Sequence, residues 1–345
     1  MKHGRTVPEL AQEISRQFKS KKDFLVAAKD VQTHVIESDN GPGLLELGFA
    51  LKGADYFTGK LTENGHNQLG SLLSIPAKYY DLMRASSAEL LANNVKYWLE
   101  RQSDRRTIRT LDGNVRAILS DKYRRLDNYD LANSVLPMLQ EAQATIESCE
   151  ITENKLYIKA ITHKVQAEVK VGDVVSAGIL ISNSETGHGS LSVKPLIYRL
   201  VCRNGTVADK YAMKKYHAGR ASEMEQIEFA NDTLNAEDKA FWLKVRDLVK
   251  HSLSEVTFKK IVSEMETATK LKIELPEHAI ELATKRFAFG EGEKSNILKH
   301  LIEGGDLTSW GLGNAVTRMA QDVESYDRST ELESIGFEIM GQSWN

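Results

Sequence analysis

Residues 167–205, AEVKVGDVVSAGILISNSETGHGSLSVKPLIYRLVCRNG, contain the clearest strand pattern of the chain. This stretch holds strand-like apolar runs that are separated by glycine, asparagine and aspartate, which is the pattern of strands and turns. The connections between the runs are too short for the crossovers that parallel strands need. Together with Leu156–Ile158 upstream, these runs predict an antiparallel meander across residues 151–208, interrupted at Gly172-Asp173 and Asn204-Gly205.

A hairpin is predicted upstream of the meander. The strand-like runs Arg105–Leu111 and Asn114–Ser120 flank Asp112-Gly113. An Asp-Gly pair suits a two-residue turn, because both central positions of that turn need positive φ.

Helical patterns surround the predicted strands. A capping box at Thr6 and Glu9 opens the first helix, and residues 63–102 have helical periodicity. Residues 129–142 predict another helix, which Pro137 would kink or start. In the helix that Ser87 is expected to cap, the predicted buried face comprises Leu90, Leu91, Val95, Trp98 and Leu99.

Charge is distributed unevenly along the 345 residues, although 45 Lys+Arg against 48 Asp+Glu give a net charge of only -3. Residues 221–345 are acidic and largely helical by pattern, and the excess of positive charge lies before them. We therefore expect an α+β protein with a central antiparallel sheet packed by helices. Its regions are a mostly helical 1–103, a β-rich basic core at 104–255 and an acidic helical 256–345.

Several functional classes leave no signature in this sequence. There is no phosphate-binding loop, no dinucleotide GxGxxG, no HExxH and no GxSxG. Two cysteines are too few for a disulfide framework, which favours a reducing cytoplasm. His163, His188 and His217 with Cys202 match no metal-ligand spacing. We expect no catalytic residue, metal, cofactor or membrane span.

The first basic segment covers residues 96–125. It holds nine basic and four acidic residues, with Tyr123 among them and Tyr97 and Trp98 just upstream of the hairpin. Cations interleaved with aromatic rings suit single-stranded nucleic acid, because cations pair with phosphates while rings stack on bases. The same charges are also compatible with a solvated strand face that has no ligand.

The second basic segment covers residues 194–220, where seven Lys+Arg stand against one Asp, and Tyr198, Tyr211 and Tyr216 lie between them. If the two segments share a groove, the groove would bind a polyanion in a salt-dependent way. The residues expected to contact DNA are Arg105, Arg106, Arg109, Arg116, Lys122, Tyr123, Arg124, Arg125, Tyr198, Arg199, Arg203, Lys214, Lys215, Tyr216 and Arg220.

Two further motifs are open to competing interpretations. In NSETGHG at residues 183–189, Glu185 and His188 offer an acid–base pair, but glycine-rich turn chemistry explains the stretch better. Trp310 is expected in a helix-packing cluster with Leu307, Leu312, Val316 and Met319 rather than in a ligand cage.

Four of these elements resemble a known family. LSDKYRRLDN at 119–128, NSETG at 183–187, PLIYRLVCRNG at 195–205 and WGLGNAVTR at 310–318 resemble motifs of the phage/plasmid-like family catalogued as domain of unknown function 932. Arg203 stands where that family commonly has threonine. The resemblance covers roughly residues 40–340 and implies the genomic setting of phages and plasmids.

Phages and plasmids often carry single-strand annealing proteins of the Red-beta/RecT kind. The order of the helices and strands predicted here is similar to the order in those proteins. We therefore expect a non-enzymatic protein that binds single-stranded DNA without ATP, as a ring or filament, and assists annealing or recombination. One alternative is a metal-dependent nuclease or hydrolase that uses Asp121, Asp127 and Glu185. Another is a counter-defence protein that binds a host protein.

Overall fold

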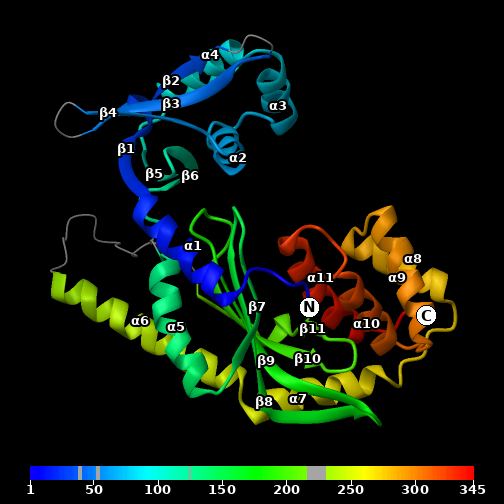
Figure 1. Cartoon of the computed structure of the whole chain (residues 1–345). Helices are drawn as coiled ribbons and strands as arrows, with labels where there is room; N and C mark the ends of the chain where they lie inside the picture. The colour runs from blue at the N-terminus through cyan, green and yellow to red at the C-terminus, as the bar shows by residue number, and fades with distance from the viewer. Residues whose placement is uncertain (38–40, 52–54, 124–125, 216–230) are drawn as a thin grey trace.

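The computed structural model describes residues 1–37, 41–51, 55–123, 126–215 and 231–345. It confirms an α+β protein with antiparallel sheets and a helical C-terminal region. Figure 1 shows a small lobe at the top, a long twisted sheet below it, and a group of helices beside that sheet.

The central sheet is the predicted meander. Its strands lie in the order β11-β10-β9-β8-β7, each antiparallel to its neighbours, and β12 pairs with β10. The strands are β7 (Thr145–Ile151), β8 (Leu156–Lys170), β9 (Asp173–Asn183), β10 (Leu191–Arg199), β11 (Asn204–Val207) and β12 (Met213–Lys215).

One strand of this sheet is longer than predicted. The runs at 156–158 and 167–171, predicted as separate strands, belong almost entirely to β8, which ends at Lys170. The pairing of β8 with β9 shifts between Thr162 and Gln166. Such an irregularity bends a strand without ending it.

The turn before β11 is also displaced from its predicted place. Asn204 and Gly205, predicted as turn residues, are the first residues of β11. The chain reverses just before them, where Arg203 has a φ of +50°. Gly205 instead permits a close approach, because a Cβ there would lie 2.7 Å from the Met1 Sδ atom.

The N-terminal lobe comprises residues 22–120 and contains two three-stranded sheets, β2-β3-β4 and β1-β5-β6. Helix α4 packs on β2 and β3. The elements are β1 (Lys22–Ala27), η1 (Ala28–Asp30), β2 (Gln32–Ile36), β3 (Leu44–Ala50), β4 (Tyr56–Lys60), α2 (Glu63–Leu72), α3 (Ala77–Ser86), α4 (Ala88–Leu99), β5 (Arg105–Leu111) and β6 (Asn114–Ser120).

The predicted hairpin is confirmed. Asp112 and Gly113 both have positive φ, at +52° and +79°. Because β5 pairs with β1 from Arg105 to Thr110, the hairpin completes the N-terminal lobe. It therefore does not belong by pairing to the region 104–255 in which we placed it.

Both faces of the central sheet are covered. Ile179 and Ile181 of β9 pack in a core with α1 (Val7–Ser20), α5 (Asn128–Glu141) and α6 (Asn231–Ser252). Leu180, between them, faces the opposite core with Tyr326. The predicted capping box of α1 is present, and Pro137 lies inside α5 without ending it.

The C-terminal region is helical, as predicted, and includes two helices that the pattern did not reveal, α8 and α11. Its helices are α7 (Glu255–Ala268), α8 (Pro276–Phe287), α9 (Glu291–Gly304), α10 (Ser309–Met319) and α11 (Tyr326–Met340). Among all helices in the described ranges, none combines the length and apolar character needed to cross a membrane.

Candidate nucleic-acid interface

The hairpin arginine Arg109 is buried rather than displayed. Its side chain is 0% exposed. Its Nε donates to the Asp23 Oδ1 atom at 2.7 Å, its Nη2 to the Asp127 Oδ1 atom at 2.7 Å, and its Nη1 to the Glu185 carbonyl at 2.9 Å. Burial disfavours the charge, but attraction to Asp23, Glu185 and Asp127 outweighs it and raises the pKa of Arg109.

Arg116 is held in the same way on β6. Its Nη2 donates to the Glu185 Oε2 atom at 2.5 Å, and the Glu185 Oε1 atom accepts from the backbone N–H of Asn128 at 2.6 Å. Lys21 forms a further ion pair with Asp127. These charges link α1, the hairpin, the start of α5 and the loop after β9. We call them the junction network: Lys21, Asp23, Arg109, Arg116, Asp127 and Glu185.

The junction network explains two of the sequence motifs. Tyr123 of the 119–128 motif donates its hydroxyl hydrogen to the Ser184 carbonyl at 2.9 Å, and Asn183 donates to the Leu126 carbonyl at 2.9 Å. Gly187 and Gly189 have positive φ, which supports the interpretation of residues 183–189 as a turn. The motifs therefore join the N-terminal lobe to the central sheet.

This arrangement contradicts part of the predicted DNA contact. Arg109 and Arg116 cannot reach a phosphate outside the protein, because they are buried and each is neutralised by carboxylates. Arg124, Arg125, Tyr216 and Arg220 lie outside the described residues.

Two of the three carboxylates of the nuclease alternative form ion pairs within the protein, whereas Asp121 is exposed. Asp127 pairs with Arg109 and Lys21, and Glu185 pairs with Arg116. Burial favours the neutral form of Asp127, but the charges of Arg109 and Lys21 outweigh burial and lower its pKa. Within the described ranges, no group of three or more His, Cys, Asp or Glu side chains is placed to hold a metal ion.

The second basic segment is also largely paired. Arg199 makes two hydrogen bonds to Asp173, at 2.6 and 2.7 Å, and Lys194 pairs with Asp209 at 2.7 Å. Tyr198 is buried at 6% exposure, which contradicts its predicted stacking on bases. Arg203 remains exposed, and Lys214 and Lys215 lie in β12.

The described parts of the two basic segments lie in different places. Arg105 pairs with Ala27 in the N-terminal lobe, whereas the Arg203 carbonyl accepts from the Met1 amino group beside the C-terminal helices. Figure 1 shows β5 in the upper lobe and β10 beside β9 in the central sheet below it. The described residues therefore do not form the single groove that we considered.

The N-terminal lobe displays an aromatic pair that sequence reasoning misplaced. Trp98, predicted on the buried face of α4, is 43% exposed, and Tyr97 is 50% exposed. Their ring centroids lie 5.2 Å apart at 89°. The Arg101 guanidinium carbon lies 3.5 Å from the Tyr97 ring centroid.

Basic side chains lie next to this aromatic pair along the chain. Arg105 and Lys122 are exposed, and Arg106 is partly exposed and pairs with Asp104 at 3.1 Å. Arg106 lies opposite Ser120 in the hairpin, so the start of β5 and the end of β6 share one edge. We call this the α4–β5 surface: Lys96, Tyr97, Trp98, Arg101, Arg105, Arg106 and Lys122. Glu100, Asp104 and Asp121 are its acidic neighbours, which leaves an excess of two positive charges.

The remaining motifs meet at a second place. A cavity of about 300 Å³ is lined by Arg199 and Cys202 from the 195–205 motif and by Trp310, Asn314 and Arg318 from the 310–318 motif. Trp310 is buried, as expected, but it packs with Phe337 and Met340 rather than in the predicted cluster.

Leu307, assigned to the same predicted cluster as Trp310, is 43% exposed. Leu312, Val316 and Met319 lie together in a separate core of the C-terminal helices. The predicted cluster is therefore divided between two cores and the surface.

The protein has an α+β fold, and its sequence motifs lie at two places. Two motifs contribute to the junction network, and the other two line the cavity that includes Arg199 and Trp310. The chain belongs to the family described as Domain of unknown function (DUF932), whose family model matches residues 117–335. No curated protein and no solved structure matches the chain. The matched region begins at Ala117, so the aromatic part of the α4–β5 surface lies before it.

Proposed function

We propose that this protein binds single-stranded DNA through the α4–β5 surface. The observation that carries the proposal is the neighbouring pair Tyr97 and Trp98, each about half exposed, with the Arg101 guanidinium against the Tyr97 ring. Exposed apolar side chains that form a contiguous patch can mark an interaction site.

Stacking is the interaction that this pair supports best. A base stacked on an aromatic side chain contributes ~1–3 kcal/mol, and every base has a π-face, so such binding tolerates any sequence. The rings of Tyr97 and Trp98 are nearly perpendicular, so the two rings present faces in different directions. Because the Arg101 guanidinium lies over one face of Tyr97, one base would stack on the other face of that ring while the next base stacks on Trp98.

The phosphates of the same strand would contact Arg105 and Lys122. Both side chains are exposed, and neither forms an ion pair with another described residue. In a plot of the logarithm of the affinity against the logarithm of the salt concentration, each phosphate contact to a single strand adds about -0.7 to the slope. Binding at this surface is therefore expected to be salt-sensitive but not governed by salt alone.

The biological role that we propose is ATP-independent annealing or recombination for a phage or plasmid, carried out by an oligomer. The motif resemblance supports this setting. The exposed rings add a physical reason, because a protein that holds bases by stacking leaves their pairing edges open to a complementary strand.

Fluorescence anisotropy tests the proposal. A labelled 30-nucleotide single strand and its duplex would be titrated with protein at 50 and 200 mM salt. We expect tighter binding to the single strand at both concentrations, because duplex bases are already stacked. Equal affinity for the two forms, or no binding at 50 mM salt, would rule out the proposed function.

A further inference from the structure

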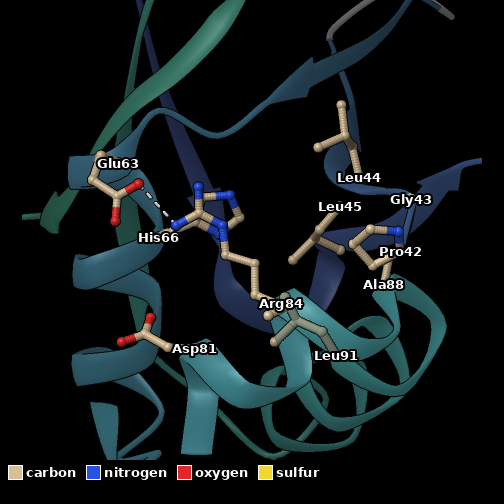
Figure 2. A pocket seen from close by; sticks show the side chains of 11 residues that line it. Pro42, Gly43, Leu44, Leu45, Glu63, His66, Asp81, Arg84, Ala88 and Leu91 are labelled. Carbon is tan, nitrogen blue, oxygen red and sulfur yellow. Dashed lines mark hydrogen bonds and ion pairs between the residues drawn. The ribbon is translucent and has the colours of Figure 1, made fainter. Parts of the chain in front are cut away.

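A cavity of about 480 Å³ in the N-terminal lobe belongs to no surface described above. Ligand pockets in proteins span ~300–1,000 Å³, so it is large enough for a small organic molecule. Helices α2, α3 and α4 and the start of β3 contribute its walls. Figure 2 shows the charged side chains at one side and the apolar ones opposite them.

The charged wall is formed by two pairs of side chains, one pair on α2 and one on α3. Glu63 and His66 lie three residues apart on α2, and Asp81 and Arg84 lie three residues apart on α3, so each pair shares a helix face. The Arg84 Nη1 atom donates to the Glu63 Oε2 atom at 2.8 Å, which joins the two helices. Asp81 is exposed and has no hydrogen bond or ion pair with the described residues.

His66 adds a buried polar group to this wall. It is 5% exposed, and its Nδ1 atom lies 2.9 Å from the Tyr80 hydroxyl oxygen. The hydrogen bond of the ring to a described residue is made by Nδ1, which leaves Nε2 available to a ligand. Burial, with the nearby charge of Arg84, lowers the pKa of His66 to about 4, so the ring is neutral at pH 7.

The opposite wall is apolar and includes buried core residues. Leu45, Ala88 and Leu91 are buried core residues at 3%, 2% and 1% exposure. Gly43 has a φ of +79°, and a Cβ there would lie 2.9 Å from the Ile36 carbonyl oxygen, so the chain enters β3 close against the sheet. A ligand with an apolar part and a polar part can therefore place the first against the leucines and the second against the charged wall.

We propose that this cavity binds a nucleobase, with guanine preferred. Guanine presents the acceptors O6 and N7 beside donor groups on its pairing edge. The Nε and Nη2 groups of Arg84, which Glu63 does not use, match the acceptors. The free carboxylate of Asp81 matches the donors, and the Nε2 atom of His66 completes the polar wall.

The position of the cavity links it to the α4–β5 surface. Leu91 lines the cavity, and Trp98 lies seven residues further along α4, which is two turns on the same face. The rise of a helix places them about 10 Å apart along the axis. A base carried by a bound strand can therefore enter the cavity, and this form of the inference rests on the proposed function. A free guanine nucleotide can enter without it.

Calorimetry with free mononucleotides tests the cavity by itself. We expect guanosine monophosphate to bind more tightly than the adenosine, cytidine and thymidine monophosphates. Asp81→Asn and Arg84→Gln should each weaken that binding by about tenfold or more, which corresponds to one lost bidentate contact. Ala85→Phe, at the exposed rim, should abolish it by filling the cavity. Glu89→Gln, an exposed carboxylate change on α4 outside the cavity, should leave it unchanged.

A second arm uses oligonucleotides and separates the two sources of the base. A thymidine 30-mer with one central guanine should bind more tightly than the thymidine 30-mer alone, and Asp81→Asn should remove that difference. If guanosine monophosphate fails to bind and the central guanine adds nothing, the inference is overturned, even when the thymidine 30-mer binds well. If no oligonucleotide binds but guanosine monophosphate does, the proposed function fails and the cavity assignment stands.

Discussion

Replacing Arg109 by methionine should destabilise the protein strongly without touching the DNA surface. The side chain is 0% exposed and joins Asp23, Asp127 and the Glu185 carbonyl. Removing one partner of a buried ion pair costs ~3–5 kcal/mol, because it leaves a buried charge uncompensated. Lys21 still neutralises Asp127, so we expect the lower end of that range. The expected loss is a large part of the free energy of unfolding of a typical domain, which is ~5–15 kcal/mol.

Urea unfolding followed by circular dichroism measures this loss, and Arg105→Met is the matched control. Arg105 lies on the same strand but is exposed, so its replacement should change the free energy of unfolding by less than ~0.5 kcal/mol. For DNA affinity the ranking should be reversed: Arg105→Met should weaken binding, whereas Arg109→Met should not. A loss below ~1 kcal/mol for Arg109→Met would refute the junction network as a stabilising element.

Three further outcomes follow from the structure. Asp127 has a lowered pKa, so its ion pairs contribute stability above the unfolded-state pKa of 3.8. This contribution should disappear as the pH falls below that value. When the free energy of unfolding is measured as a function of pH, the loss in acid should be smaller in Arg109→Met than in the unmodified protein. Gly313→Ala should destabilise the α10–α11 contact by at least ~1 kcal/mol in thermal unfolding, because the new Cβ would lie 2.6 Å from the Gly336 carbonyl, whereas Gly292→Ala in α9 meets nothing within 4 Å and should be neutral or stabilising. The double variant Arg105→Ala with Lys122→Ala should flatten the plot of log affinity against log salt by about 1.4, the sum for two phosphate contacts, and an unchanged slope would exclude both residues from the interface.

The fold was predictable where local rules act alone. Asp112-Gly113 predicted the hairpin because a two-residue turn requires their backbone conformation. Thr6 and Glu9 predicted the start of α1 for an equally local reason, the satisfaction of free N–H groups. The short connections of the meander left only antiparallel pairing.

The candidate site was less predictable because burial depends on distant residues. Arg105 and Arg109 lie four residues apart on one face of β5, yet one is exposed and the other buried. The difference arises from the loop that carries Glu185, 76 residues further along the chain. A count of charges within 96–125 could not separate the two.

The error at Trp98 has a similar origin. Leu91 and Trp98 share one face of α4, and the helical period assigns that whole face to the core. The core follows α4 to its last residue, because Val95 and Leu99 are 0% and 2% exposed, but Trp98 lies at the margin of this buried face and is 43% exposed. Only the tertiary structure shows where the neighbouring elements stop.

The most direct test of the α4–β5 surface is the affinity of Tyr97→Ala/Trp98→Ala for a labelled single-stranded 30-mer. Loss of two stacking contacts of ~1–3 kcal/mol each predicts at least a thirtyfold weaker affinity in anisotropy titrations. Tyr56→Ala is the control, because Tyr56 is 46% exposed in the same lobe but lies in β4. We expect the control to bind like the unmodified protein. If the double variant, folded by circular dichroism, binds the strand as tightly as the control, the α4–β5 surface is not the DNA-binding site.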